Sequence, residues 1–162
     1  MIDSHCHLNF PGIRVDIKNI IKRCEANGVN KLLTINTNPD EFDDHLNLIK
    51  DFDNIYIAYG IHPDKVTENT YLSFADIENR IKDSRVIGIG ETGLDFYNSI
   101  EFKKKQYEIF ESHIRASKEF ELPIIIHQRD SEKEIIEVLK KYKNDKLKLV
   151  FHCFTGSNEL LR

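Results

Sequence analysis

Five side chains that could bind a divalent metal ion stand at or next to the ends of short apolar runs: His5, His7, Glu91, His127 and His152. Imidazole nitrogens combined with a carboxylate oxygen form a donor set that Zn²⁺, Mn²⁺ or Mg²⁺ accepts. Each residue alone has a plainer explanation, because His-x-His arises by chance and a buried histidine or glutamate is more often hydrogen-bonded or ion-paired. Five such groups together favour metal ligands, since burying ionisable groups without partners is costly.

The segment from Asp3 to His7 predicts a two-toothed metal clamp. Side chains alternate along a strand, so His5 and His7 point to one side together with Asp3, while Cys6 points to the other. Asp3 is then placed to accept a hydrogen bond from a histidine ring and to fix its tautomer.

Two further residues are candidates for substrate binding. His62 follows an apolar run in Gly60-Ile61-His62-Pro63, where it either contacts substrate or braces a turn. Arg129 comes two residues after His127, and its forked donors suit a phosphate oxygen. A structural ion pair with Asp130 is the alternative interpretation of Arg129.

The remaining histidines and a lysine run are expected to have no part in the chemistry. His45 lies within a helical segment among polar neighbours, so we expect it to be solvated. His113 shares a helical stripe with Gln106 and Phe110, which predicts packing between a helix and the sheet with one hydrogen bond. Residues 103–105, three lysines, are expected on the exposed face of that helix.

Short β-rich runs alternate with segments of helical periodicity along the whole chain. The expected strands are residues 1–5, 31–34, 55–60, 86–91, 123–127 and 147–152. The expected helices are residues 15–27, 41–51, 71–83, 100–120, 132–142 and the start of another after Ser157. The order is therefore a repeated βα unit.

Local turn signals support these boundaries. Asn27-Gly28 predicts a helix C-terminus, and Asn38-Pro39 predicts a helix start. Ser131 followed by Glu134 predicts a capping box at the start of the fifth helix.

Strict βα alternation predicts a parallel sheet with right-handed crossovers, which is either an open doubly wound sheet or a closed barrel. The strands recur near the interval of roughly 31 residues that a TIM-type (β/α) barrel requires, so we expect an α/β barrel with about six of its eight units present. An incomplete barrel exposes two strand edges, and residues 160–162 stand within an apparent helix. We therefore interpret residues 1–162 as a single barrel domain, truncated at its C-terminus, with a complete open sheet as the alternative.

Composition sets further limits. The chain has 162 residues, 40% hydrophobic and 31% charged, which is typical of a soluble globular protein. The net charge of −4 excludes a broad basic surface of the kind that non-specific nucleic-acid binders use. Three cysteines at unrelated spacings, with neither a signal peptide nor an apolar run near the roughly 20 residues of a membrane span, favour a cytoplasmic protein without membrane contact.

Several motifs occur together in one order: Ile2-Asp3-Ser4-His5-Cys6-His7-Leu8, Gly60-Ile61-His62-Pro63, Gly88-Ile89-Gly90-Glu91-Thr92-Gly93-Leu94-Asp95-Phe96, Ile126-His127-Gln128-Arg129-Asp130-Ser131 and His152-Cys153-Phe154-Thr155-Gly156. This pattern resembles the TatD-type deoxyribonucleases, a branch of the amidohydrolase-like metal barrels. Gln128 stands where a serine is common in the family, which is a minor departure.

The resemblance implies a TIM-type barrel, two divalent metal ions (Mg, Mn or Zn) and hydrolysis of DNA, often as a 3′-to-5′ exonuclease on single-stranded ends. It implies that His5 and His7 hold one ion, that His127 and His152 hold the other, and that Glu91 bridges both as the catalytic carboxylate. The family also uses an aspartate after a later strand, which would lie beyond Arg162. No obligate protein partner follows from the sequence.

Two other functions stay open at this point. The same ligands could cleave an amide, a lactone or an ester, including an ester that links an amino acid to tRNA. A truncated chain that lacks one ligand could also be a non-catalytic remnant.

Overall fold

The computed structural model describes residues 1–143 and 147–160. Its strands are β1 (Ile2–Cys6), β2 (Lys31–Ile35), β3 (Ile55–Tyr59), β4 (Val86–Asp95), β5 (Ile124–Arg129) and β6 (Leu149–Phe151). Its α-helices are α1 (Pro11–Arg14), α2 (Ile17–Ala26), α3 (Phe42–Ile49), α4 (Phe74–Arg80), α5 (Lys103–Phe120) and α6 (Glu132–Tyr142). Short 3₁₀ helices are η1 (Pro39–Glu41), η2 (Pro63–Lys65) and η3 (Ile100–Phe102).

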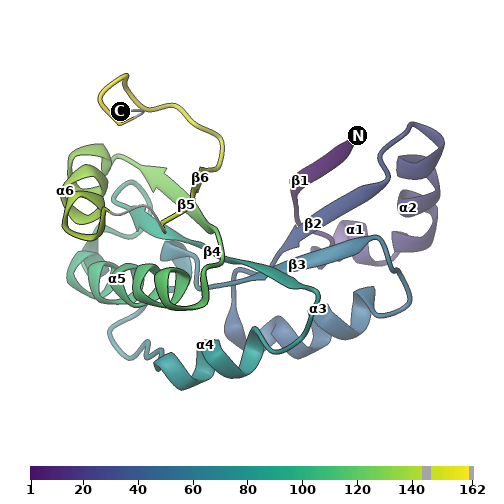
Figure 1. Ribbon diagram of the computed structural model, residues 1–162, viewed down its shortest axis with the longest axis horizontal. Helices are drawn as coiled ribbons and strands as arrows, with labels where there is room; N and C mark the ends of the chain where they lie inside the picture. The colour runs from purple at the N-terminus through teal and green to yellow at the C-terminus, as the bar shows by residue number, and fades with distance from the viewer. Residues whose placement is uncertain (144–146, 161–162) are drawn as a thin grey trace.

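The six strands form one parallel sheet in the order β1-β2-β3-β4-β5-β6. A doubly wound sheet reverses its strand order at a switch point, whereas a barrel follows the chain from strand to strand. The sheet curls strongly, with β1 and β6 at its two ends and the helices outside the curve (Figure 1). The expected partial (β/α) barrel is therefore confirmed.

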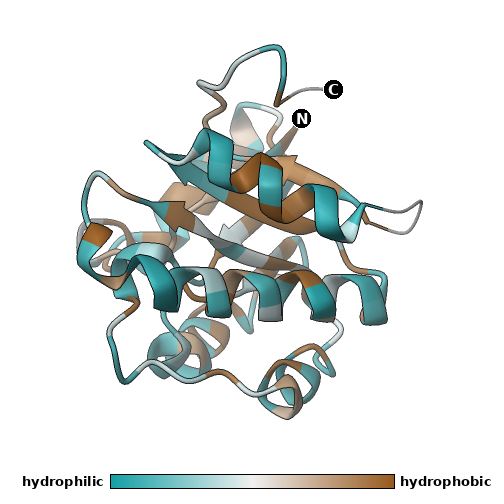
Figure 2. Ribbon diagram, turned by 90° about the vertical axis from the view of Figure 1, so that its left-hand side faces the viewer, coloured by the Kyte–Doolittle hydropathy of each residue, from teal (hydrophilic) through white to brown (hydrophobic). Residues whose placement is uncertain are grey.

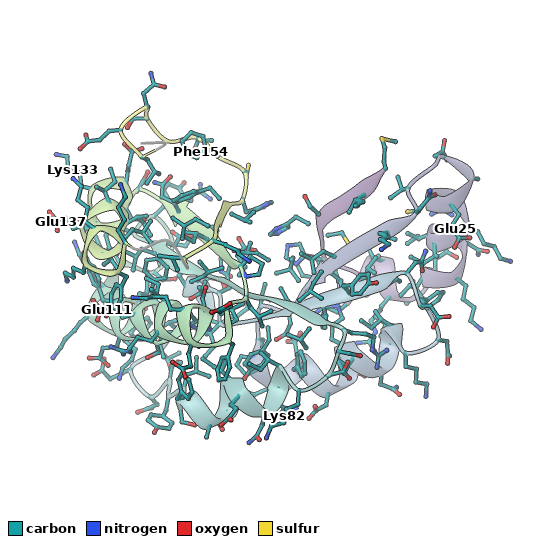
Figure 3. The ribbon with its side chains drawn as sticks, viewed as in Figure 1. Glu25, Lys82, Glu111, Lys133, Glu137 and Phe154 are labelled. Atoms are coloured by element: carbon teal, nitrogen blue, oxygen red, sulfur yellow. The ribbon has the colours of Figure 1, made fainter. Side chains whose placement is uncertain are left out.

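Hydrophobic residues line the sheet and the helix faces that cover it (Figure 2). Leu32, Ile57 and Ile89 lie in the larger core between β1–β4 and the helices, while Ile124 and Ile126 belong to a second cluster under α5 and α6. Charged residues such as Lys82 and Glu137 project outward (Figure 3). Within the described residues, no helix has the length and apolar character needed to cross a membrane.

The two end strands are uncovered, as the sequence predicts for an incomplete barrel. Ile2 of β1 is 69% exposed and Val150 of β6 is 45% exposed. Each end strand thus keeps one edge without a neighbouring strand in the described sheet.

Several element bounds differ from expectation, among them the end of β4 and the segment after Ser157. Strand β4 does not end at Glu91 but continues to Asp95. After a register irregularity between Gly90 and Thr92, it continues to pair with β5. After Ser157, residues 158–160 form a turn, and residues 161–162 of the expected sixth helix lie outside the described residues.

The turn signals were right in two places and wrong in one. Gly28 follows α2 with φ of 75°, and Asn38 accepts a hydrogen bond from the Asp40 N–H at the start of η1. Helix α6 begins after Ser131 as expected, but the prediction of a capping box is wrong, because the Ser131 side chain makes no capping hydrogen bond. The Ser131 hydroxyl donates instead to the Leu94 carbonyl at 2.8 Å and so ties α6 to β4.

The prediction for His45 is wrong. This histidine shares the buried stripe of α3 with Phe42 and Ile49, is fully buried, and lies 2.9 Å from Thr34 Oγ1. Burial lowers its pKa to about 4, so it is neutral in the folded protein at neutral pH. Its polar neighbours in sequence lie on other faces of the helix, so they did not indicate that His45 is buried.

The prediction for His113 is confirmed. It is fully buried between α5 and the sheet, and its Nδ1 lies 2.7 Å from the Ile109 carbonyl oxygen. Its Nε2 accepts a hydrogen bond from the Ile61 N–H at 3.2 Å. His113 therefore fastens α5 to the loop that carries His62.

Candidate metal centre

Glu91 stands at the centre of the site because β4 is irregular around it. Gly90 and Gly93 have φ of 124° and 145°, and a Cβ at either position would collide with a carbonyl of β5. Only glycine allows this close approach of two backbones. Glu91, between them, is 2% exposed and points into the hollow of the sheet, and Gly93 pairs with His127 across β5.

One side of Glu91 is built by residues that follow β3 and end β4 and β5. His127 Nδ1 lies 3.1 Å from Glu91 Oε1 and 3.0 Å from His62 Nε2. The other ring nitrogen of His127, Nε2, lies 3.0 Å from Asp95 Oδ2. His62 Nε2 is itself 3.7 Å from Glu91 Oε1.

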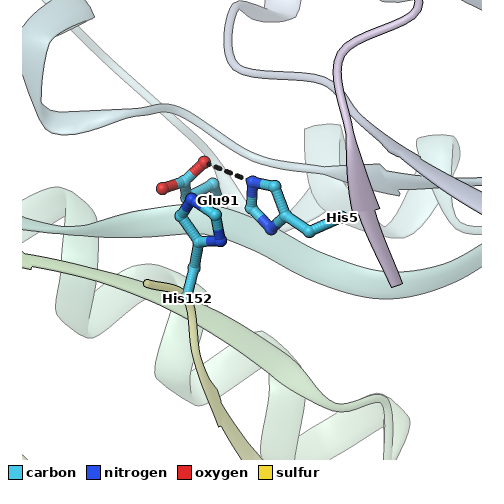
Figure 4. A group of neighbouring side chains, drawn as sticks. All are labelled: His5, Glu91 and His152. Atoms are coloured by element: carbon cyan, nitrogen blue, oxygen red, sulfur yellow. Dashed lines mark ion pairs between the residues drawn. The ribbon is translucent and has the colours of Figure 1, made fainter. Parts of the chain in front are cut away.

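The other side of Glu91 is built by β1 and the residue after β6. His5 Nε2 lies 3.2 Å from Glu91 Oε2, and His152 reaches the same carboxylate from the far end of the sheet (Figure 4). The rings of His5 and His152 are stacked with centroids 3.4 Å apart, while the His7 ring is 5.1 Å from that of His5. Side chains from the two ends of the sheet therefore meet here.

The charges of the site follow from these contacts. Burial alone would raise the pKa of Glu91, but the imidazoles of His127 and His5 hold it well below its usual range. Burial works against a charged His127, yet its contacts with Glu91 and Asp95 raise its pKa. Burial lowers the pKa of His7 and of His152. The centre is thus an ionised carboxylate among imidazoles.

The donor atoms fit divalent metal ions. Within each of two groups, His5-Glu91-His152 and His62-Glu91-His127, one atom per residue can be chosen so that all three lie within 4.8 Å of one another. The buried Nδ1 of His7 has no hydrogen-bond partner among the described residues. Unpartnered buried nitrogens are costly, and a bound cation would satisfy them.

The two groups differ in detail from the ligand pairing that the resemblance implies. All five expected ligands lie close together at one end of the barrel, and Glu91 belongs to both groups, as expected for a shared ligand. However, His5 is grouped with His152, and His127 with His62, whereas His7 lies beside the first group without joining it. His62, expected to bind substrate, lies among the candidate ligands.

The site opens into a cavity of ≈ 810 Å³ that His7, His62, Glu91, His127 and His152 line from below. Arg129 lines its rim, with its guanidinium carbon 3.9 Å from the centre of the Tyr97 ring. The alternative pair of Arg129 with Asp130 is not formed, because within residues 1–143 and 147–160 Arg129 has no ion pair. Its donors are thus directed to no acidic side chain in the described chain.

Asp3 lies in a different position from the one expected. Its Oδ1 accepts a hydrogen bond from the backbone N–H of His5 at 3.0 Å. The pairing of β1 with β2 has a register irregularity between Asp3 and Cys6. The contact therefore holds the backbone of the clamp and does not hold an imidazole ring.

Asp95 is a residue of the site that the sequence analysis did not assign. It is fully buried at the end of β4 and contacts His127 from the side opposite Glu91. The motif containing Asp95 was visible, but its role was not, because Glu91 was taken as the end of the strand. An aspartate four residues beyond a ligand, followed by the turn-forming Asn98, is the signal that was available.

Comparison with known proteins agrees with the fold. The sequence model of the TatD related DNase family matches residues 2–162. The chain belongs to this family. It is therefore a member of a family of metal-dependent hydrolases.

Two relatives of the chain are also described as metal-dependent hydrolases. The chain is 33% identical over 162 residues to YabD of Bacillus subtilis, an uncharacterized metal-dependent hydrolase, covering 100% of this chain and 64% of YabD. It is 30% identical to YcfH of Escherichia coli K12, with the same description, covering 98% of this chain and 60% of YcfH. The chain thus spans about three-fifths of the length of these curated relatives.

Solved structures give the same fold. The crystal structure of YjjV, a TatD homologue from Escherichia coli K12, superposes with a TM-score of 0.88 at 26% identity, covering 99% of this chain and 62% of YjjV. An uncharacterized amidohydrolase from Saccharomyces cerevisiae superposes with a TM-score of 0.76 at 20% identity, a likeness of fold alone.

Proposed function

We propose that this protein hydrolyses phosphodiester bonds of DNA, acting on single-stranded ends as a 3′-to-5′ exonuclease, with two divalent ions bound on either side of Glu91. The observation that carries the proposal is one buried carboxylate shared by two groups of imidazoles at the floor of an open cavity. The family membership supports the metal dependence.

The residues divide the chemistry between them. Two ions bound there would lower the pKa of a bound water to about 7 and neutralise charge on the reacting phosphate. Glu91 offers Oε1 to the His127 side and Oε2 to the His5 side, so the single carboxylate fixes the distance between the two positions. Arg129 at the rim offers its donors to a non-bridging phosphate oxygen.

The acidic net charge does not oppose this function. A net charge of −4 lowers the attraction of the whole surface for a polyanion. Bound dications would concentrate positive charge at the one place where the scissile phosphate docks. DNA is therefore drawn to the cavity itself, and the proposal requires no basic patch elsewhere.

The test uses the 162-residue chain with Mg²⁺ or Mn²⁺ and end-labelled single-stranded DNA, beside a panel of esters, lactones and amides. We expect release of nucleotides, and a loss of at least about 100-fold in Glu91→Ala and His127→Ala, since each removes a ligand. Glu137→Ala is the matched control, because Glu137 is exposed on α6 and projects away from the cavity (Figure 3).

Each other outcome contradicts part of the proposal. Turnover confined to the small-molecule panel would replace the DNA substrate by an amide or ester. Full cleavage by both ligand variants would overturn the site, and absence of turnover on every substrate would overturn catalysis by this chain.

A further inference from the structure

His127 faces two carboxylates, one with each nitrogen of its ring. Its Nδ1 points to the centre, 3.1 Å from Glu91 Oε1 and 3.0 Å from His62 Nε2. Its Nε2 points away from the centre, 3.0 Å from Asp95 Oδ2. The role of His127 depends on which nitrogen carries the proton, because only the other nitrogen has a lone pair to offer a cation.

The carboxylate of Asp95 is held as an acceptor by its own turn. Oδ1 accepts hydrogen bonds from the Tyr97 N–H at 3.0 Å and the Asn98 N–H at 2.8 Å, and Oδ2 accepts from Asn98 Nδ2 at 2.8 Å. Three N–H donors thus converge on one fully buried carboxylate. Toward its fourth neighbour, His127, it remains an acceptor, so Nε2 is the donor of that pair.

Gln106 of α5 fixes the backbone of the same turn. Its Oε1 accepts from the Asp95 N–H at 2.8 Å, and its Nε2 donates to the carbonyls of Asp95 at 3.2 Å and Ser99 at 2.7 Å. Gln106 is fully buried, so water does not compete for these bonds. The position of the Asp95 carboxylate is therefore determined by the fold before any ligand binds.

We infer that Asp95 is a positioning residue that places the proton of His127 on Nε2, so that Nδ1 is the atom presented to a divalent ion. The inference rests on the metal-binding part of the proposed function and not on the identity of the substrate. A carboxylate that accepts from a ligating histidine orients the ring and makes the opposite nitrogen a better donor to the metal.

The neighbouring pair of Asp64 and His62 offers a comparison within the same site. Asp64 Oδ1 lies 2.6 Å from His62 Nδ1, so this ring also meets a carboxylate on the side away from Glu91. Asp64 is exposed, however, and its own backbone N–H points to the same His62 nitrogen at 3.2 Å. This competition leaves the proton of His62 less firmly placed than that of His127.

The first test observes the imidazole nitrogens of His127 by NMR in the metal-free 162-residue chain at a pH above the raised pKa of this ring, so that the ring carries a single proton. We expect the Nε2–H tautomer in the unsubstituted chain and a mixture of tautomers in Asp95→Asn. An Nδ1–H tautomer in the unsubstituted chain would overturn the inference, and this measurement needs neither activity nor a variant that folds.

The second test measures Zn²⁺ binding by calorimetry. Asp95→Asn should weaken the affinity about 10- to 100-fold, a typical effect for the partner of a ligating histidine, and Asp95→Glu should recover part of the loss. Asp64→Asn is the matched control and should weaken binding less than Asp95→Asn. Equal affinity in Asp95→Asn and the unsubstituted chain would overturn the inference, whereas absence of Zn²⁺ binding by every chain would overturn the proposed function and leave the NMR test standing.

Discussion

The two sides of Glu91 are held in different ways. On the side of His127, both nitrogens of that ring have polar partners, and the carboxylate behind it is locked by a turn and by α5. On the side of His5 and His152, two rings are stacked, His5 Nε2 lies 3.2 Å from Glu91 Oε2, and the buried Nδ1 of the adjacent His7 has no hydrogen-bond partner among the described residues. The first side is organised by the protein, and the second is complete only with a bound cation.

The difference follows from where each side lies in the sheet. His127 and Glu91 come from adjacent strands in the interior of the sheet, so hydrogen bonds of the ladder fix their separation. His5 and His152 come from its two ends, and a cation held between them would join β1 to the segment after β6. We therefore expect the first side to respond to groups in the core and the second to metal.

Acidification should weaken the support that two buried histidines give to the elements around the site. His113 accepts the Ile61 N–H at Nε2 while its Nδ1 faces the Ile109 carbonyl, so protonating Nε2 would set two donors against each other. Burial lowers the pKa of His113 and of His45 to about 4, against 6.5 for a free histidine. Because both pKa values are lower in the folded state, their full contribution to stability is present above pH 6.5 and is lost as the pH falls toward 4.

As the pH falls from 6.5 toward 4, protonation of each of these histidines should lower the free energy of unfolding by about 3 kcal/mol. Urea unfolding at pH 7, 6, 5 and 4.5 measures the loss, and NMR titration of the two rings assigns it. A free energy that stays constant over this range would show that these rings accept a proton without cost.

Much of this arrangement could be predicted from the sequence, because parallel strands bring their C-terminal ends to the same end of the barrel. His5, Glu91, His127 and His152 all arrive where the βα order places them. That prediction needs only the number and direction of strands and no side-chain detail.

The rest depends on contacts between elements that periodicity does not encode. Strand β4 continues past Glu91 because two glycines let β5 approach, and the pairing of Asp95 with His127 exists only in that shifted register. His45 was assigned to solvent from its neighbours in sequence, but the helix turns it onto Thr34. In both cases the deciding neighbour is distant in the chain.

Metal should stabilise the folded chain, and this effect tests the metal-completed side. With free Zn²⁺ at 100 to 1,000 times its dissociation constant, binding to the folded state adds roughly 3–4 kcal/mol. Thermal unfolding with Zn²⁺ and with a chelator measures the difference. His5→Ala and His152→Ala should each remove most of it, since each takes away a ligand that joins one end of the sheet to Glu91.

The control for this comparison is Glu137→Ala, which changes charge on the outer face of α6 and should respond to Zn²⁺ as the unsubstituted chain does. An undiminished Zn²⁺ response in both histidine variants would mean that the ends of the sheet take no part in binding. The comparison between the two sides would then fail.

The smallest expected effect is that of Arg129, which stands at the rim of the cavity and belongs to neither side. Its guanidinium carbon lies 3.9 Å from the centre of the Tyr97 ring, a cation–π contact that favours one position of the group, and its forked N–H donors suit a phosphate. Arg129→Lys keeps the charge but loses the fork, and should raise KM for end-labelled single-stranded DNA about 10-fold, or about 1.4 kcal/mol, with little change in kcat. Arg23→Lys is the matched control, because it makes the same exchange at an exposed position of α2 that does not line the cavity. A KM unchanged in Arg129→Lys would show that the forked donors of Arg129 take no part in phosphate binding.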